Sequence, residues 1–470
     1  MMSVLSKYRD LPRHLLPRVT LQWELEMSQQ FIEFLQSADA DSIPEEMFGL
    51  GRKWLLDLLG VAAGGTETSM SRIMRDHVAE HFAPGRRKVP MLFDGRLASP
   101  GGAALAGGIT IDALDAHDGH KLTKGHVGCG VLPALLSFTQ AEQLKDDRGF
   151  LASLVVGYEI GTRAGIALHR TACDYHTSGA WIAIAAAALG ARSMGLDSTK
   201  TREAIGIAEY HGPRSQMMRV VDQPTMVKDG SGWGAMAGVS AAYLAAEGFT
   251  GAPAVTVEGE DVADLWDDLG QTWRIAEQYY KHYPICRWAQ PPVQAVLDLR
   301  KTNDLKSEDV EKIEITTFHN SKRLAKSAPV TTEEAQYSTA YPTAVAMVRG
   351  QVSPDDVMEQ SFSDPEIKRL AAGMSVVESD AYNAAFPANR ISSVTLTLKN
   401  GEKLTSGDTE ALGDPENPVT EEEVKAKFHA YAGPKLGSER TAALEKAVGQ
   451  LGNGEGLEAF QDLIFAPVHT

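Results

Sequence analysis

The chain has 470 residues and a formal net charge of −17 at pH 7, with 43% hydrophobic and 23% charged residues. This composition is typical of a globular protein that is long enough for one large domain and a smaller one. The acidic balance argues against nucleic acid as a partner, because phosphate binding needs a basic surface, and an anionic substrate would need a local group of cations to receive it.

Cysteine content and apolar patterning both favour a cytoplasmic location. The three Cys are odd in number and far apart, which suggests a reducing compartment without a disulfide framework. Residues 1–19 lack the long apolar segment of a signal peptide, and the longest apolar run, residues 180–189, is too short to span a membrane. We therefore expect a cytoplasmic protein that does not bind membranes.

Residues 20–270 are predicted to be mostly helical. Apolar side chains recur at helical spacing in residues 48–63. Residues 180–195 and 232–248 are dense in Ala and Gly; because Gly disfavours helices, close packing or a ligand must offset its presence, which predicts central helices of a compact bundle. The other helices predicted in this part of the chain comprise residues 100–114, 132–144 and 148–170.

The pattern changes near residue 276. Residues 310–317 alternate apolar and polar side chains like a half-buried strand, and residues 393–398 do the same before an Asn400-Gly401 turn that predicts a hairpin. Helical patterns return at residues 332–348, 365–373 and 420–465, the last of them beginning at Thr420.

These elements predict a mainly α protein with two parts. Residues 1–275 would form a large all-helical domain, completed by residues 413–470 if the last helices pack back on it. Residues 276–412 would then form a smaller, inserted α+β domain.

The most informative segment is DALDAHDGHKLTKGHVGCGVLP, residues 112–133. It places several titratable side chains between two apolar helices, where they are costly unless they are paired or used. His126 precedes a predicted helix start, where an imidazole could contact a carboxylate or an anion, or could simply cap the helix. Asp115 could orient a catalytic His or Lys, or merely end a helix.

Further candidates lie elsewhere in the chain. His176 precedes an Ala-rich helix, with Thr177 and Ser178 as expected N-cap residues, and could equally be a loop His. Lys228 lies in a Gly-rich turn before a helix, a position that favours an anion nearby. Lys281 and Arg287 belong to a cationic cluster at the predicted domain boundary, where either a cleft or a surface hinge is expected.

A metal site is a weaker hypothesis. His117-Asp118 with His120 is similar to the His-Asp dipeptide of metal phosphohydrolases, but a dipeptide is common by chance and further ligands are not evident. The phosphate-binding GxxxxGK[ST] motif is absent, and GxGxxG does not occur between a strand and a helix. We therefore expect neither a metal nor an organic cofactor.

Eight segments in order resemble the MmgE/PrpD family, which includes 2-methylcitrate dehydratases, cis-aconitate decarboxylases and iminodisuccinate epimerases. Each match is modest, but their order along nearly the whole chain is specific. The segments are WLLDLLGVAAGG (54–65), SPGGAALAGGITIDALDAHD (99–118), HVGCGVLPALLS (126–137), GYEIGTRAG (157–165), HTSGAWIAIAAAALGARSMGLD (176–197), MVKDGSGWGAMAGVSAAYLAAEGFTG (226–251), KHYPICRWAQPPVQA (281–295) and AQYSTAYPTAVAMVRG (335–350).

The resemblance implies a homodimer in which the α+β domain is a lid over an active site at the domain cleft. The chain departs from the family pattern at His117, where an acidic residue is usual, and at Gln290, where a His is usual. The family's site residues correspond here to Asp115, His126, His176, Lys228, Lys281 and Tyr341.

The leading hypothesis is a cofactor-free lyase, either a dehydratase or a decarboxylase, that acts on a small di- or tricarboxylate. His126 and His176 would be the acid/base pair, oriented by Asp115. Lys228 and Lys281 would bind carboxylates and stabilise charge beside the reacting carbon.

Tyr341 would supply a hydrogen bond or a proton, and Arg287 and His117 would contribute to substrate binding. An epimerase or isomerase of a similar anion is the nearest rival hypothesis, because the same groups could return the proton to the opposite face. A non-catalytic anion-binding homologue and a metal phosphohydrolase are also compatible with parts of the pattern.

Overall fold

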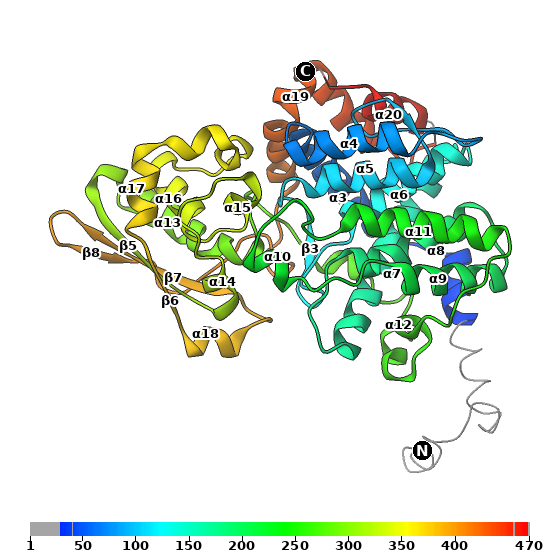
Figure 1. Ribbon diagram of the computed structural model, residues 1–470, viewed down its shortest axis with the longest axis horizontal. Coiled ribbons are helices and arrows are strands. Elements are labelled where there is room, and N and C mark those ends of the chain that lie inside the picture. The colour runs from blue at the N-terminus through cyan, green and yellow to red at the C-terminus, as the bar shows by residue number, and fades with distance from the viewer. Residues whose placement is uncertain (1–28, 40, 455, 469–470) are drawn as a thin grey trace, which may run out of the picture.

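The computed structural model describes residues 29–39, 41–454 and 456–468. Residues 20–28 of the predicted helical region, and the N-terminal segment examined for a signal peptide, lie outside these ranges. Figure 1 shows two parts side by side, which we call the helical body and the sheet unit. The body contains helices from both ends of the chain, and the sheet unit contains the largest sheet.

The helical body contains most of the predicted helices close to their expected bounds. Its N-terminal portion comprises α3 (Glu45–Gly65), α4 (Ser69–His81), α5 (Pro100–Asp112), α6 (Gly128–Ala141), α7 (Asp147–Thr171), α8 (Gly179–Ser193), α9 (Ser198–His211), α10 (Met218–Asp222), α11 (Ser231–Ala246) and α12 (Val255–Glu258). Its short strands are β1 (Val89–Pro90), β2 (Leu97–Ala98) and β3 (Gly119–His120), the last of which pairs with β4 (Gln278–Tyr279).

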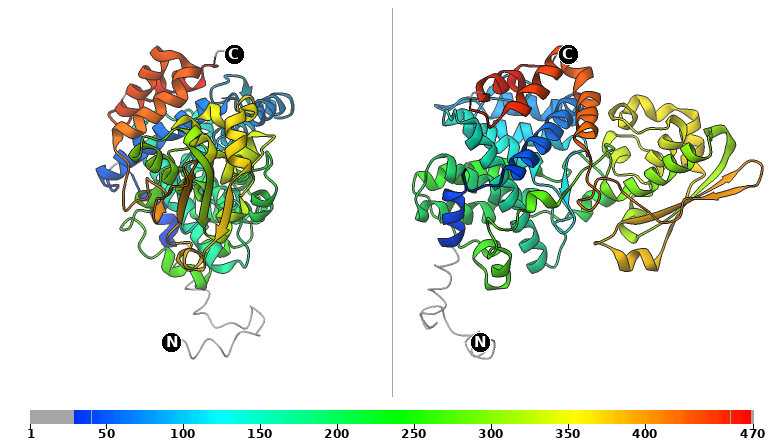
Figure 2. Two further views of the ribbon diagram at one scale, coloured as in Figure 1. Left: turned by 90° about the vertical axis from the view of Figure 1, so that its left-hand side faces the viewer. Right: turned by 180° about the vertical axis from the view of Figure 1, so that it is seen from behind.

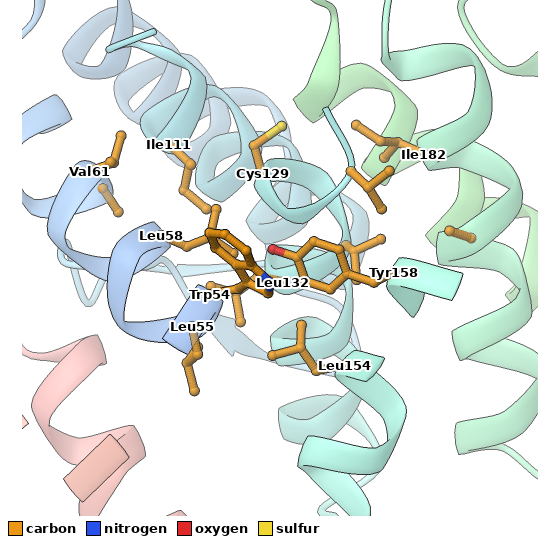
Figure 3. Close-up of a cluster of buried hydrophobic side chains, with 14 of the residues drawn as sticks. Trp54, Leu55, Leu58, Val61, Ile111, Cys129, Leu132, Leu154, Tyr158 and Ile182 are labelled. Carbon is orange, nitrogen blue, oxygen red and sulfur yellow. The ribbon is translucent and has the colours of Figure 1, made fainter. Parts of the chain in front are cut away.

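Small residues let the central helices approach closely, as their composition predicts. A Cβ atom at Gly108 of α5 would lie only 2.6 Å from the Cα atom of Gly232 of α11, so only glycine permits this contact. Figure 3 shows the larger side chains of the same core, where Trp54 and Leu58 of α3 lie near Tyr158 of α7. The ends of these tightly packed helices therefore hold the loops between them in fixed positions.

Helix α7 is long and apolar enough to cross a membrane, but the whole of its most apolar window is buried inside the protein. Burial of this kind is typical of the central helix of a soluble protein. The apolar surface of α7 therefore belongs to the core.

The sheet unit has strand order β6-β5-β7-β8, with β9 also paired to β7. β5 runs parallel to β6 and antiparallel to β7, with Ile313 opposite Leu396, and the predicted hairpin turn at Asn400-Gly401 leads into β8. The elements are α13 (Gln290–Thr302), β5 (Val310–Thr317), α14 (His319–Arg323), α15 (Thr332–Gln336), α16 (Ala340–Arg349), α17 (Pro365–Ala372), β6 (Ser375–Glu378), α18 (Asp380–Ala385), β7 (Ile391–Leu398), β8 (Lys403–Thr405) and β9 (Thr409–Glu410).

The chain then returns to the helical body (Figure 2). Helix α19 (Glu421–Gln450) begins at a capping box formed by Thr420 and Glu423, and it is followed by α20 (Leu457–Phe465). Helix α19 packs on α3 so closely that a Cβ atom at Gly60 of α3 would lie 3.1 Å from the Cα atom of Phe428. The prediction of a mainly α protein is confirmed.

Candidate active site

A small closed cavity of about 20 Å³ lies where the sheet unit meets the helical body. Every residue that lines it is buried or half-buried, and its volume has room for about one water molecule, well below the range for small-molecule sites. Titratable and charged side chains converge on it from segments far apart in the sequence: Asp115, Lys124, His126, Asp229, Lys281, Arg287 and Arg390.

A wider and more open groove adjoins this cavity on the surface, lined by Thr177, Gln216, Arg219 and Trp233 among others. Lys228 contributes to its wall, but the described residues that line it include no His, and their acidic member is Asp222. Acid/base chemistry needs a base and an acid facing one space. The closed cavity, where these groups meet, is therefore the better candidate.

His126 is held as a neutral base that faces the cavity. It lies in the loop before α6, where its backbone N–H donates to Ser178 Oγ (3.0 Å). Its ring Nδ1–H donates to the carbonyl oxygen of Asp118, and this bond leaves the lone pair on Nε2. Burial, followed by the positive charge of Lys281, lowers the pKa of His126 from 6.5 to about 3.

Two carboxylates lie on either side of this Nε2 atom. Asp115 Oδ1 is 3.8 Å from it and Asp229 Oδ2 is 3.9 Å from it. Both carboxylates are buried, yet their environments differ. A carboxyl group from each of two distant segments of the chain therefore lies within 4 Å of Nε2.

Asp115 is the charged member of this pair of carboxylates. Its Oδ1 atom forms an ion pair with Lys281 Nζ. Burial acts to raise the pKa of Asp115, but Lys281 and Lys228 outweigh it and lower the pKa below its ordinary value. The same contact with Asp115 overcomes burial at Lys281 and raises its pKa. The two groups thus keep each other ionised.

The environment of Asp229 shifts its pKa in the opposite direction from that of Asp115. Burial raises its pKa, and the negative charges of Asp112 and Asp115 add to this effect against the opposing influence of His126. Ser178 Oγ donates to Asp229 Oδ1 (2.9 Å), and the Tyr337 hydroxyl lies 3.5 Å from Oδ2. The environment of Asp229 therefore favours its protonated form more than water does.

Lys228 lies behind this arrangement rather than in the wall of the closed cavity. Its Nζ atom donates to the carbonyl oxygen of Asp112 and to Gln336 Oε1 (2.8 Å). Gln336 Oε1 also accepts the backbone N–H of Asp115 (2.8 Å), so Lys228 helps to fix the position of that carboxylate. The backbone of Lys228 has a positive φ of 39°, a conformation that is unusual for a non-glycine residue.

Lys427 of α19 joins the segments that carry the site. Its Nζ atom donates to the backbone carbonyl oxygens of Ala116 (2.6 Å) and Lys281 (2.8 Å) and to Asp57 Oδ1 (2.7 Å). A buried ammonium with three such partners holds the loop after α5 against the segment that carries Lys281. The C-terminal helix therefore contributes directly to the position of the Asp115–Lys281 pair.

Comparison with known proteins covers both parts of the chain. Residues 29–266 match the MmgE/PrpD N-terminal domain, and residues 283–452 match the MmgE/PrpD C-terminal domain. The chain belongs to the MmgE/PrpD family.

Relatives in this family share little sequence identity with the chain but align over almost its whole length. Human cis-aconitate decarboxylase is 24% identical over 94% of this chain and 95% of its own length. A cis-aconitate decarboxylase-like protein of Aspergillus oryzae, oryM, is 22% identical over 86% of this chain and 90% of its own length. Mouse cis-aconitate decarboxylase is 21% identical over 94% of both chains.

Two residues expected from the MmgE/PrpD resemblance lie outside the cavity. His176 forms a backbone bridge with Gln216, and because successive side chains of an extended segment point to opposite sides, Tyr175 lines the cavity while His176 does not. Tyr341 lies inside the sheet unit, where its hydroxyl donates to the carbonyl oxygen of Asp356 (2.8 Å). Tyr337, four residues earlier, is the tyrosine that reaches the site.

Three other positions noted in the sequence make contacts with the surrounding protein that use up most of their polar groups or bury their rings. Arg287 lines the cavity, but its guanidinium donates to the carbonyl oxygens of Tyr280 and Leu412 and pairs with Asp414. His117 is fully buried, with its ring centroid 4.4 Å from that of His126, and it packs behind the base. The Gln290 side chain donates to backbone carbonyls in the preceding turn, so this departure from the family pattern does not alter the cavity wall.

Ser178 lies at the expected N-cap position of α8 but does not cap the helix with its side chain. Its backbone is already helical, and its side chain makes no capping bond. The hydroxyl is instead engaged by His126 and Asp229. A short polar side chain at a helix start does predict a hydrogen bond, but the partner is the site rather than the helix.

The residues considered for a metal point in different directions. Asp118 accepts a hydrogen bond from the Tyr158 hydroxyl, His120 Nε2 lies 2.9 Å from Glu277 Oε2, and His117 packs on His126. Within residues 29–39, 41–454 and 456–468, no group of three or more His, Cys, Asp or Glu side chains is arranged to hold a metal ion.

The neutral state of His126 can be tested directly. In protein labelled with ¹⁵N-histidine, its ring signals, assigned by comparison with a His126→Gln variant, should keep the neutral Nδ1–H pattern from pH 8 to about pH 5. Because the unfolded chain binds a proton at this residue below pH 6.5 and the folded chain does not, His126 should also make the fold less stable as the pH falls from 6.5 towards 3. Titration of the ring near pH 6.5 would contradict the assignment.

Proposed function

We propose that this protein is a lyase that removes CO₂ or water from a small tricarboxylate or dicarboxylate without an organic cofactor. The observation that carries the proposal is that His126 Nε2 meets the carboxyl groups of Asp115 and Asp229 in one closed, cation-lined cavity, where the pKa of His126 is lowered and that of Asp229 is raised. Environments that push two pKa values apart are typical of a base and an acid with separate roles. The cis-aconitate decarboxylase relatives support decarboxylation as the leading form of this activity.

The base in this proposal is His126 Nε2. A proton on a carbon next to a carboxylate is weakly acidic, and its removal builds negative charge on the substrate. The imidazolium formed at His126 would lie less than 4 Å from the carboxylate of Asp115, which stabilises the positive charge. Asp115 therefore acts on the base rather than on the substrate.

The acid is Asp229 in place of His176. In a dehydration it would protonate the departing hydroxyl group while His126 takes the carbon-bound proton. In a decarboxylation it would supply the proton that reaches carbon as the bond to the leaving carboxylate breaks. Tyr337, at 3.5 Å from Asp229, is placed to exchange a hydrogen bond with it during either step.

Lys281 is the cation nearest the reacting groups. Its ammonium is paired with Asp115 and is buried in the cavity wall, where a charge interacts more strongly than in water. It would stabilise enolate-like charge on the substrate. Lys228 would act more indirectly, through Gln336 and the backbone of Asp115.

We also propose that the sheet unit, which forms most of residues 276–412, acts as a lid, whereas the segment before it that carries Lys281 is held to the helical body by the pairing of β4 with β3. The cavity is enclosed by residues of both the helical body and the sheet unit, and its lining is buried. A substrate can enter only if the two parts separate, and closure would then exclude water from the reaction. This motion explains how a site with such buried charges can exchange ligands.

The expected homodimer and cytoplasmic location stay predictions. Helix α11 is apolar on all sides, yet Trp233 and Leu244 are each 42% exposed, which favours coverage by another surface. Sedimentation velocity would decide between a monomer of 50.7 kDa and a dimer of twice that mass.

The function is tested by incubating the protein with a panel of carboxylates in D₂O and following each by NMR. The panel includes cis-aconitate, 2-methylcitrate, citrate and simple dicarboxylates. The expected result is either loss of CO₂ from one tricarboxylate with deuterium incorporated into the product, or loss of water from it. Deuterium exchange without net loss would show an epimerase or isomerase, and thermal stabilisation by citrate without turnover of any compound would show a binding protein; either outcome would replace the proposal.

A further inference from the structure

Arg390 is a buried guanidinium whose hydrogen-bonding groups are not all used. It lies just before β7 in the sheet unit, in the loop that follows α18 (Figure 1), and it is 5% exposed. Its Nη2 atom donates to the carbonyl oxygen of Lys121 (3.3 Å), but Nε and Nη1 have no partner among the residues that the structure describes. Buried polar groups without partners are rare and costly, so this arrangement needs an explanation.

The neighbouring cations are more fully paired than Arg390. Arg287 and Arg390 lie against the same ring, that of Tyr279, at 4.6 Å and 5.2 Å from its centroid. Arg287 uses both terminal nitrogens on backbone carbonyls and Asp414 and leaves only Nε without a partner, and Lys281 is paired with Asp115. Within the described ranges, Arg390 forms no ion pair with a carboxylate.

Lys124 adds to this excess of positive charge. It lines the same cavity with its Nζ atom 4.8 Å from the centroid of the Tyr175 ring. Burial and the nearby charge of Arg390 lower the pKa of Lys124. Two cations close together in a buried wall repel each other unless an anion lies between or beside them.

We propose that Arg390 is the recognition residue for a second carboxylate of the substrate, which it binds through Nε and one terminal nitrogen. This proposal rests on the proposed function, because it assumes that the substrate is a carboxylate. It adds that Arg390, in the sheet unit, selects substrates with more than one carboxylate group. A guanidinium presents its N–H groups as a planar fork that matches the two oxygens of a carboxylate. The Tyr279 ring holds the plane of the fork in place.

The position of Arg390 links recognition to closure. The side chain belongs to the sheet unit but contacts the carbonyl oxygen of Lys121 in the helical body. A carboxylate bound by Arg390 on one side and facing Lys281 and His126 on the other would bridge the two parts. A monocarboxylate could occupy the Lys281 side without engaging the lid.

The test measures binding of three probes to the intact protein by titration calorimetry: tricarballylate, succinate and acetate. For Arg390→Gln the affinity for tricarballylate should fall about 10- to 100-fold, as expected for loss of a charge-assisted bidentate contact, while the weak binding of acetate stays within about twofold. Arg390→Lys keeps the charge but loses the fork and should fall between Arg390→Gln and the wild type. In turnover assays both variants should raise KM for a tricarboxylate more than they lower kcat.

Arg369→Gln is the matched control, because this arginine lies on the outside of the sheet unit and pairs with Glu366. It should bind all three probes like the wild type. Equal tricarballylate affinity in the wild type and both Arg390 variants would overturn the proposal, as would an equal loss for acetate and tricarballylate. If Arg390→Gln does not fold, the Arg390→Lys comparison decides alone. Binding that depends on Arg390 in a protein without turnover would support this inference while removing the lyase assignment.

Discussion

Replacement of His126 by Gln is expected to lower kcat by about 10²- to 10⁴-fold on the true substrate, the usual contribution of a positioned general base. Gln can keep the hydrogen bond to the carbonyl oxygen of Asp118, which His126 makes through Nδ1. It cannot accept a proton at the position of Nε2. Steady-state kinetics, with circular dichroism to verify folding, provide the measurement.

His176→Gln is the matched control for this substitution. His176 has the same side chain and lies in a neighbouring loop, but it does not line the cavity. The kcat of the His176→Gln variant should stay within about threefold of the wild type, since His176 does not face the reacting atoms. A large loss in His176→Gln together with full activity in His126→Gln would reverse the assignment of the base.

The second large effect concerns the buried pair of Asp115 and Lys281. Lys281→Met should lower the free energy of unfolding by about 3–5 kcal/mol, because it leaves the Asp115 carboxylate buried without its cation. Asp115 normally has a lowered pKa, so it stabilises the fold above the pKa of the unfolded chain and loses this contribution as the pH falls through its folded pKa. The urea midpoint at pH 7.5 measures the change.

The double variant Lys281→Met/Asp115→Asn separates stability from function. Removing both charges should restore most of the lost stability, because an amide is far cheaper to bury than an unpaired carboxylate. Activity should not return, since neither the cation beside the substrate nor the carboxylate beside His126 is present. A Lys281→Met variant as stable as the wild type would show that Lys281 is not the cation that stabilises the buried Asp115 carboxylate.

The sequence predicts the framework of this protein better than its chemistry. The strand predicted over residues 310–317 matches β5, because a half-buried strand alternates apolar and polar side chains. The predicted helix over residues 332–348 is instead two helices, α15 and α16, with a break that contains Tyr337. Local periodicity indicates helical residues well but does not show where a tertiary contact interrupts them.

The same break explains why Tyr337, and not Tyr341, lines the cavity. Tyr337 and Tyr341 lie four residues apart in one motif, and in a continuous helix they would share a face. The interruption after Gln336 directs Tyr337 to Asp229, while Tyr341 packs against Phe362 inside the sheet unit. His176 lies outside the cavity for a similar reason, since the direction of alternation in its extended segment is set by the pairing with Gln216.

Two site residues are not predicted from the sequence. Asp229 follows Lys228 directly in the chain, and an acidic residue in a Gly-rich turn before an apolar helix is a signal that could have indicated it. Arg390 has no such signal, because it is a single Arg before a strand and its role depends on the approach of the sheet unit to the helical body. Long-range placement of this kind is set by tertiary packing rather than by local pattern.

The most direct test of the central claim is a crystal structure of the protein with tricarballylate bound. We expect one carboxylate at Arg390, another near Lys281, and the central carbon within about 4 Å of His126 Nε2, a distance suited to proton transfer after a small adjustment. Tricarballylate bound instead in the open groove beside Gln216 and Trp233, with the cavity between the two parts empty, would contradict it.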